Sequence, residues 1–276
     1  MFLFQVTMAI DPASRPSIWA FSTSRLLHVF EAVAPTLADE FEVRVFEGGF
    51  EGALATVREL TQAGEQVDAL VAAGANGAYL HDHADLPVVV VEASTVDALQ
   101  GVIQARKLSK RIGVVNFRRI VAGLDEAKWL LGATDFEQRA YVTPEDARAR
   151  VAELAAGGTE VIIGPGPVCA LAEQAGLAAV LLYGQDSLVE AIRRAAEITA
   201  ISRGEAARRE ALQRALDQLE PGLISVDVEE RIVAVNGAVE RLLGAGAAEL
   251  LGKRLTSLSP ALGLARTLAT GRGGSR

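Results

Sequence analysis

The sequence is poor in cysteine and histidine. Cysteine forms the disulfide bonds that stabilise small folds, and both residues are common metal ligands. The sequence has one cysteine, Cys169, and three histidines in 276 residues. A single cysteine forms no internal disulfide, which fits a reducing cytoplasm. The run His81-Asp82-His83 offers two histidine ligands without a third nearby, so we predict a surface loop there and no metal site. His28 follows two leucines, and we expect it at the edge of the core.

Long apolar runs and an excess of positive charge are missing as well. No stretch approaches the roughly 18 apolar residues of a membrane span. Residues 1–10 are apolar but lack the basic start and small-residue cleavage site of a secretory signal. The net charge is −8, with the excess acid in residues 1–199, whereas nucleic-acid binding needs clustered positive charge. Hydrophobic residues make up 50%, which excludes extensive disorder. We expect a soluble cytoplasmic protein without a membrane partner.

What the sequence has is an internal repeat with a spacing of about 94 residues. Apolar runs, helical patterns and strand-like segments recur in the same order. The matching pairs are 17–22 with 112–116, 41–46 with 136–141, 54–63 with 147–156, 68–74 with 160–166, and 87–91 with 179–182. Five correspondences in order predict two copies of one structural unit, about 16–95 and 96–200.

Each predicted half alternates strands with helices, which indicates an α/β fold with a parallel sheet covered by helices. Two such halves side by side form a cleft. Ligands of parallel sheets bind beyond the carboxyl ends of the strands, where loops and helix N-termini present backbone N–H groups. The sequence therefore predicts a ligand site between the halves.

The loops at the predicted strand ends favour an anion. The run Gly74-Ala75-Asn76-Gly77 leaves N–H groups bare, and arginines after strand ends grip carboxylates in a bidentate manner. For a single loop, plain turns and solvated arginines remain the alternative interpretation, but matching loops in both halves favour binding of a small polycarboxylate. The predicted ligand-binding residues are Ser22, Thr23, Ser24, Arg25, Gly74, Ala75, Asn76, Gly77, Asn116, Phe117, Arg118, Arg119, Gly164, Gly166 and Tyr183.

Within this set, three side chains are expected to clamp the ligand. Arg25 would reach from the first half and Arg119 from the matching place in the second, with Arg118 as the alternative to Arg119. The side-chain amide of Asn76 would add a hydrogen-bond donor.

The alternative to a binding module is an enzyme of the two-half racemase or lyase kind, acting on a small carboxylic acid. Such racemases use one cysteine from each half, but the counterpart of Cys169 lies near Tyr79 and no second cysteine exists. Cys169 is therefore interpreted as a small buried hydrophobe. A nucleophile elbow and a phosphate-binding loop are also missing. We predict no catalytic residues, no metal and no cofactor. A solute-uptake binding protein is a third hypothesis, disfavoured by the lack of a secretory signal.

From about Gln185 the chain turns into a long amphipathic helical pattern. Ser202-Arg203-Gly204 is expected to break it into a helix on the sensor and a connector helix over 201–219. Apolar residues at 212, 216 and 219 with flanking charge favour a dimerising helix, and hence a homo-oligomer, over two ordinary helices on one core.

Residues 220–270 read as an α+β segment. Two short strands, 223–227 and 231–236, flank a turn at Glu229-Glu230, and a helix over 237–243 stops at Gly244. The hairpin and the following Leu-Leu-Gly-Lys run at 250–253 resemble the opening of a PAS domain. A PAS domain needs three further strands, so the chain is either a fragment or carries an unfinished PAS domain. Residues 271–276 are expected to be a flexible tail and 1–15 an N-terminal extension.

Residues 16–200 resemble the N-terminal sensor region of PrpR-type propionate-catabolism activators, which are sigma-54-dependent transcription factors. The resemblance is carried by the runs at 72–80, 112–115, 140–148, 158–160 and 171–176. It implies two Rossmann-like halves that sense a propionate-derived metabolite such as 2-methylcitrate, a tricarboxylate. Family members continue into an AAA+ ATPase and a helix-turn-helix DNA-binding domain, which we expect only in a longer protein. The resemblance thus implies a regulatory region.

Overall fold

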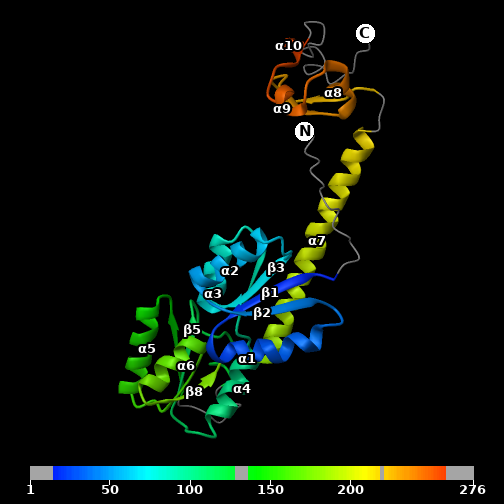
Figure 1. Cartoon of the computed structure of the whole chain (residues 1–276). Coiled ribbons are helices and arrows are strands. Elements are labelled where there is room, and N and C mark those ends of the chain that lie inside the picture. Colours follow the sequence, from blue (N-terminus) through cyan, green and yellow to red (C-terminus); the bar gives the residue numbers. More distant parts are fainter. Residues whose placement is uncertain (1–14, 128–135, 218–220, 259–276) are drawn as a thin grey trace. The chain divides into compact units, whose positions relative to one another are not determined.

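The computed structural model describes residues 15–127, 136–217 and 221–258, which divide into two units, 1–202 and 203–276 (Figure 1). Residues 1–14 of the predicted extension at 1–15 and the whole predicted tail at 271–276 lie outside the described residues. The first unit contains two parallel sheets of four strands each, which confirms the predicted fold class. Among the described residues, no helix combines the length and apolar composition needed to cross a bilayer.

The first sheet has the strand order β2-β1-β3-β4. Its central strand β1 is buried along its whole length, as its unbroken apolar run requires, because helices cover both faces of the sheet. Ile18 pairs with Val43 on one side and with Ala69 on the other. Its elements are β1 (Ser17–Ser22), α1 (Ser24–Val33), η1 (Ala34–Leu37), β2 (Glu42–Glu47), α2 (Phe50–Gln62), β3 (Ala69–Ala73), α3 (Gly74–His83) and β4 (Val88–Val91).

The second sheet repeats this arrangement in the order β6-β5-β7-β8. Ile112 pairs with Phe136 and with Val161, as Ile18 does with its two neighbours. The common strand order shows that the sequence repeat is a structural one. The elements are α4 (Thr95–Ala105), β5 (Ile112–Phe117), β6 (Phe136–Tyr141), α5 (Pro144–Ala156), β7 (Val161–Gly164), α6 (Gly166–Gln174), β8 (Ala178–Leu181) and α7 (Gln185–Asp217).

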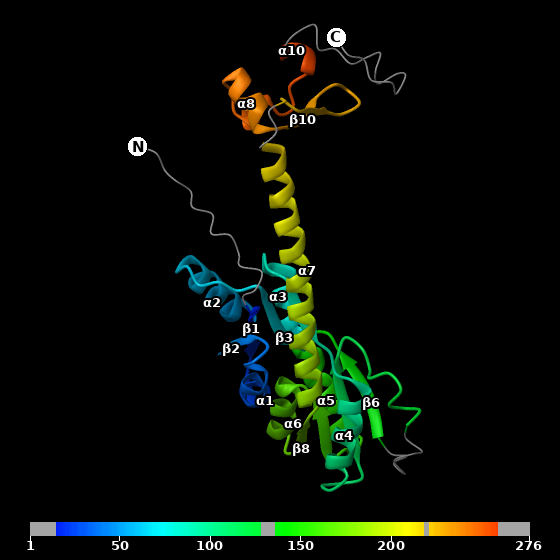
Figure 2. The ribbon, with the colours of Figure 1, turned by 90° about the vertical axis from the view of Figure 1, so that its right-hand side faces the viewer.

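The last helix of each half packs on the other half (Figure 2). Helix α4 follows the first sheet but places Ala98 and Val102 against Ile163 of the second. Helix α7 follows the second sheet but places Leu188 and Ile192 in the core of the first. The other face of each sheet is covered locally, by α2 and α3 in the first half and by α5 and α6 in the second. The chain therefore crosses between the halves twice, at residues 92–94 and 182–184.

Helix α7 runs without interruption through residues 202–204, so the predicted break there is wrong. One glycine in a helix costs only about 1 kcal/mol. Gly204 lies between good helix formers, which offset that cost.

The second unit holds a small hairpin of β9 (Ile224–Val226) and β10 (Ile232–Val235), followed by α8 (Gly237–Leu243), α9 (Ala247–Leu250) and α10 (Leu255–Leu258). The side chain of Asp227 accepts hydrogen bonds from the N–H groups of Glu229 and Arg231, both at 2.9 Å, which shapes the predicted turn. Asn236 is 2% exposed and caps α8. Gly244 ends α8 in the left-handed conformation, with φ of 62°.

Candidate functional site

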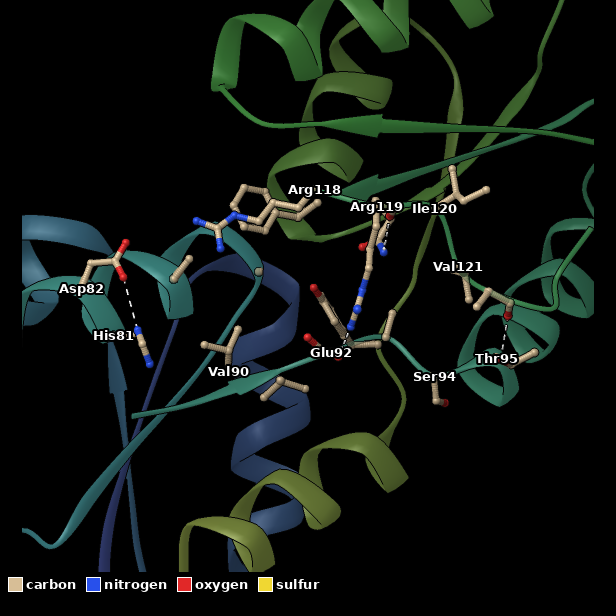
Figure 3. A pocket seen from close by; sticks show the side chains of 18 residues that line it. His81, Asp82, Val90, Glu92, Ser94, Thr95, Arg118, Arg119, Ile120 and Val121 are labelled. Atoms are coloured by element: carbon tan, nitrogen blue, oxygen red, sulfur yellow. Dashed lines mark hydrogen bonds and ion pairs between the residues drawn. The ribbon is translucent and has the colours of Figure 1, made fainter. Parts of the chain in front are cut away.

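A cavity of about 790 Å³ lies between the halves, where strands of both sheets end (Figure 3). We call it the large pocket. The end of β4 and the start of α4 form one wall with α3, and the loop after β5 forms the facing wall. Its lining residues are Gly74, Ala78, His81, Asp82, 90–95, 116–122 and Tyr183.

Arg118 extends from the second half into the large pocket, towards the side where His81 and Asp82 lie (Figure 3). Its backbone adopts φ of 60° and its N–H donates to the carbonyl of Tyr141 at 2.7 Å. Its guanidinium lies 5.1 Å from the centre of the Phe117 ring, a cation–π contact that supports the side chain. Among the described residues, no carboxylate pairs with this guanidinium, which leaves its N–H donors available to an anion.

The other charged groups of the large pocket are paired with one another. Arg119 forms an ion pair with Glu92 across the two halves, and His81 lies 3.2 Å from Asp82. Both pairs are well exposed, so each contributes little stability. The positive charges of Arg118 and Arg119 formally balance the negative charges of Glu92 and Asp82. Net charge therefore does not favour an anion in this pocket, and Arg118 is its one charged group without a described partner of opposite charge.

Asn116 lines the large pocket and is 6% exposed. Its Nδ2 donates to the carbonyl of Arg119 at 3.0 Å, whereas its buried Oδ1 has no hydrogen-bond partner in the described structure. A buried acceptor without a donor costs about 1–3 kcal/mol. A hydroxyl group of a ligand could satisfy it.

A second, smaller cavity of about 60 Å³ shares Gly74 and Tyr183 with the large pocket. We call it the recess. Residues of the first half and of the second half both line it, together with Tyr183 on the second crossing. The lining residues are 21–23, Leu26, Gly49, Phe50, 73–76, Tyr141, 165–167 and Tyr183.

The two cavities contain most of the residues predicted from the sequence. Gly74 and Tyr183 line both. Asn116, Phe117, Arg118 and Arg119 line the large pocket. Ser22, Thr23, Ala75, Asn76 and Gly166 line the recess. The side chain of Ser24 lies outside what the structure describes. Arg25, Gly77 and Gly164 line neither cavity.

Arg25 bonds to the other half instead of lining a cavity. Its guanidinium forms an ion pair with Glu173 of α6 and donates to the carbonyl of Ala179 at 3.2 Å. It does reach across from the first half, as predicted, but its partner is a protein carboxylate. Sequence could not reveal this, because Glu173 is far away in the chain.

Asn76 also has structural partners. Its Oδ1 accepts from the N–H of Phe50 at 2.8 Å, and its Nδ2 lies 3.3 Å from the carbonyl of Gly48. Its side chain thereby fixes the start of α2, and donation from its amide to a ligand stays a prediction. Gly77 and Gly164 serve packing, since an added Cβ would come within 2.4 Å and 2.5 Å of neighbouring atoms.

Some lining residues were not predicted. Tyr141 ends β6, and the rule that strand ends line the cleft could have identified it. His81 and Asp82 lie seven and eight residues after Gly74 on α3, which is about two helical turns. This spacing places them on the same side of the helix as Gly74, and it could have predicted them as lining residues. They form the last turn of a helix rather than a loop, which corrects that prediction. In the described part of the chain, no group of three potential metal ligands is found.

Two other predictions concern single residues. Cys169 is fully buried, as predicted, and its thiol donates to the carbonyls of Gly164 and Val180 at 3.3 and 3.4 Å. Burial raises its pKa to about 11. His28 is not at the core edge: its side chain is 80% exposed and lies 3.0 Å from Glu31. Leu26, Phe30 and Val33 take the buried face of α1 instead.

Comparisons with known proteins place the chain in a family. Residues 37–205 match the model of the propionate catabolism activator family, PrpR_N, and residues 210–262 match the PAS fold. Among solved structures, an NtrC family transcriptional regulator from Clostridium acetobutylicum is 17% identical, with a TM-score of 0.58 over 68% of this chain and 98% of that one. This likeness shows a shared fold.

Two further structures are more distant. A conserved domain protein from Vibrio cholerae is 14% identical, with a TM-score of 0.34 over 71% of this chain and 85% of that one. An ABC domain from Streptococcus pneumonia in complex with L-Trp is 14% identical, with a TM-score of 0.33 over 61% and 74%.

Two repeated α/β halves followed by a PAS fold define the class of this chain, the regulatory region of a transcription regulator. The chain belongs to the propionate catabolism activator family, of which residues 37–205 are the N-terminal sensor region.

Proposed function

We propose that residues 16–200 sense a small polycarboxylate, such as 2-methylcitrate, which binds between the two halves. One observation carries this proposal: the 790 Å³ pocket contains the guanidinium of Arg118, which no described carboxylate neutralises. Arginine recognises carboxylates through paired hydrogen bonds. The family to which the chain belongs supports a metabolite of propionate catabolism as the ligand.

The chemistry of the lining suits a hydroxylated acid. Carboxylates of the ligand would accept from the guanidinium of Arg118. The hydroxyl that citrate-like acids carry would donate to the buried Oδ1 of Asn116. A simple monocarboxylate such as propionate satisfies fewer of these groups.

The proposed role is regulatory rather than catalytic. Cys169 is buried with a raised pKa, which leaves its thiol protonated and unable to act as an acid–base group near neutral pH. In the alternative, an enzyme of the racemase or lyase kind would use the same cavity. ATP binding and DNA binding, in this proposal, belong to other parts of a longer cytoplasmic protein.

The proposed organisation has the sensor over 16–200, a connector over 201–219 and a PAS-like segment over 220–270. In the described residues of the connector, Leu212 and Leu216 are 59% and 41% exposed and lie one helical turn apart on α7. This spacing supports pairing of the connector with a second copy, and hence a homo-oligomer.

Titration calorimetry of the full chain with 2-methylcitrate, citrate and propionate tests the proposed ligand class. We expect 2-methylcitrate or citrate to bind, and Arg118→Ala to weaken that binding about 10- to 100-fold, as loss of a charge-assisted hydrogen bond typically does. Arg148→Ala is the matched control, because Arg148 is exposed on α5 and outside both cavities.

Absence of binding heat from all three acids, with folded protein, would contradict the proposal. Equal affinity of the Arg118→Ala variant would place the ligand elsewhere. Chemical conversion of the acid during incubation would favour the enzyme instead.

A further inference from the structure

We infer that the recess is a seat for one carboxylate of the ligand, formed by the N-termini of three helices and the hydroxyl groups of Tyr141 and Tyr183. We call these groups together the carboxylate seat. The inference rests on the proposed function, because the rest of the ligand would extend into the large pocket. It adds a subsite and two tyrosine donors that the sequence did not single out as a pair.

The first observation is the convergence of helix N-termini. Helices α1, α3 and α6 begin at the recess, after Thr23, Ala73 and Pro165. None of these three described N-termini has a side-chain cap. By contrast, α4 and α5 are capped by the side chains of Ser94 and Thr143. The first N–H groups of a helix have no partner within it and carry partial positive charge, which favours an anion.

The second observation is independent of the helices. Tyr141 and Tyr183 are each 5% exposed, and both line the recess. Within the described residues, neither hydroxyl group has a hydrogen-bond partner. Burial raises the pKa of both phenols, that of Tyr141 to about 12, so both remain protonated donors at neutral pH. Neither hydroxyl oxygen is among the fully buried atoms that lack a partner, so both keep some accessible surface, and both tyrosines line the recess. The two hydroxyl groups are therefore available to a ligand atom in the recess.

Gly74 brings the helix and the phenol together. It is the first residue of α3, it has φ of 54°, and a Cβ there would lie 3.2 Å from the hydroxyl oxygen of Tyr183. A side chain at this position would therefore be strained and would crowd the space between the N–H groups and the hydroxyl. Gly74 also lines both cavities, so the recess adjoins the large pocket at this residue.

The composition of the recess selects a single negative charge. Among its described lining residues there is no charged side chain, while Phe21, Leu26 and Phe50 make part of the wall apolar. Partial charges and neutral hydroxyl groups compensate a monoanion better than a phosphate dianion. The volume of about 60 Å³ suits one small group, not a whole tricarboxylate.

The seat would link ligand binding to the approach of the two halves. Tyr141 belongs to the second half, α3 belongs to the first, and Tyr183 lies on the crossing between them. A carboxylate bound to all three groups bridges the halves at the point where the chain passes from one to the other.

The test uses Tyr141→Phe and Tyr183→Phe in the full chain, which remove only the hydroxyl groups. Calorimetry with 2-methylcitrate, citrate, propionate and inorganic phosphate should show affinity for the tightest acid lowered about 10- to 100-fold in each variant. Tyr79→Phe is the matched control, because Tyr79 lies outside both cavities. Thermal unfolding of the ligand-free variants should not shift downward, since no hydrogen bond within the described protein is lost.

The outcomes separate the seat from the proposed function. If the wild-type chain binds an acid and both variants bind it equally well, the seat is wrong while the proposed function stands. If no polycarboxylate binds, the proposed function fails, and the measurement with propionate then tests the seat by itself. Weak propionate binding to the wild-type chain that is lost in Tyr183→Phe supports the seat. Absence of propionate binding to the wild-type chain overturns the seat as well. Phosphate binding tighter than every carboxylate would contradict a seat for a monoanion. A variant that loses both stability and affinity would assign the tyrosine a structural role.

Discussion

Cys169 illustrates how burial fixes the chemistry of a single side chain. It lies on α6 with no exposure, and its thiol donates to two backbone carbonyls. Desolvation raises its pKa from 9.0 to about 11. In the unfolded chain the thiol loses its proton at lower pH, so between about pH 9 and pH 11 the native state binds more protons than the unfolded state. Stability therefore falls as pH rises through this window.

We predict that Cys169→Ala reduces this alkaline loss of stability by up to about 3 kcal/mol relative to the wild-type chain. Tyrosine titration is common to both proteins and cancels in the comparison. Urea unfolding at pH 8 and at pH 11 measures the difference. A thiol reagent at pH 8 should label the wild-type protein only after unfolding. Parallel pH profiles, or rapid labelling of native protein, would show that the thiol is accessible.

At the residue scale, the sequence predicted which segments meet at the cleft better than what each side chain does there. Arg118 and Arg119 are neighbours in sequence, yet Arg119 pairs with Glu92 while Arg118 has no described carboxylate partner. Asn76 and Arg25 were predicted as ligand contacts, but each bonds to protein groups far away in the chain. Such pairings depend on tertiary distances, which a local pattern does not contain.

At the scale of elements, the two crossings between the halves are joined by Asp97. This residue is 3% exposed and forms a capping box with Ser94 at the start of α4. Its Oδ1 also accepts from the N–H of Gly184 at 3.0 Å, and its Oδ2 accepts from the hydroxyl group of Ser187. One carboxylate thus holds the start of α4 to the start of α7.

We predict that Asp97→Ala lowers the free energy of unfolding by at least about 2 kcal/mol, since several hydrogen bonds to a buried charged group are lost. Asp146→Ala is the matched control, because Asp146 holds the equivalent position in α5 but bonds only within its own helix start, to Val142 and Arg150. It should cost about 1 kcal/mol, as helix caps do. Urea unfolding measures both. Equal losses would mean that Asp97 acts only as a cap.

Apolar periodicity and capping residues in the sequence predicted the strands and helices. The same patterns did not predict how the helices pack on the sheets. The prediction of a break at Gly204 failed because one glycine is a weak signal inside a long run of helix formers. The exchange of α4 and α7 between the halves could not be predicted, since an amphipathic helix does not specify which sheet it covers.

At the scale of the molecule, the internal repeat explains the position of the site. Two sheets with the same strand order present their carboxyl ends to a shared cleft, and the crossings place Ser94 and Tyr183 in its lining. The repeat was readable from the sequence, and with it the fold and the existence of a cleft. The division into a large pocket and a recess was not readable, because it arises from the contact of the halves.

Hydrogen exchange of the full chain with and without saturating 2-methylcitrate tests most directly whether the ligand binds between the halves. At short exchange times, we predict slower exchange of backbone N–H groups in residues 74–77 and 116–122 and at Gly166 and Val168, which lie at or beside the two cavities in both halves. Exchange in the exposed turns of α5 should remain unchanged. Protection confined to residues 221–258, or to one half alone, would contradict a ligand held between the two halves.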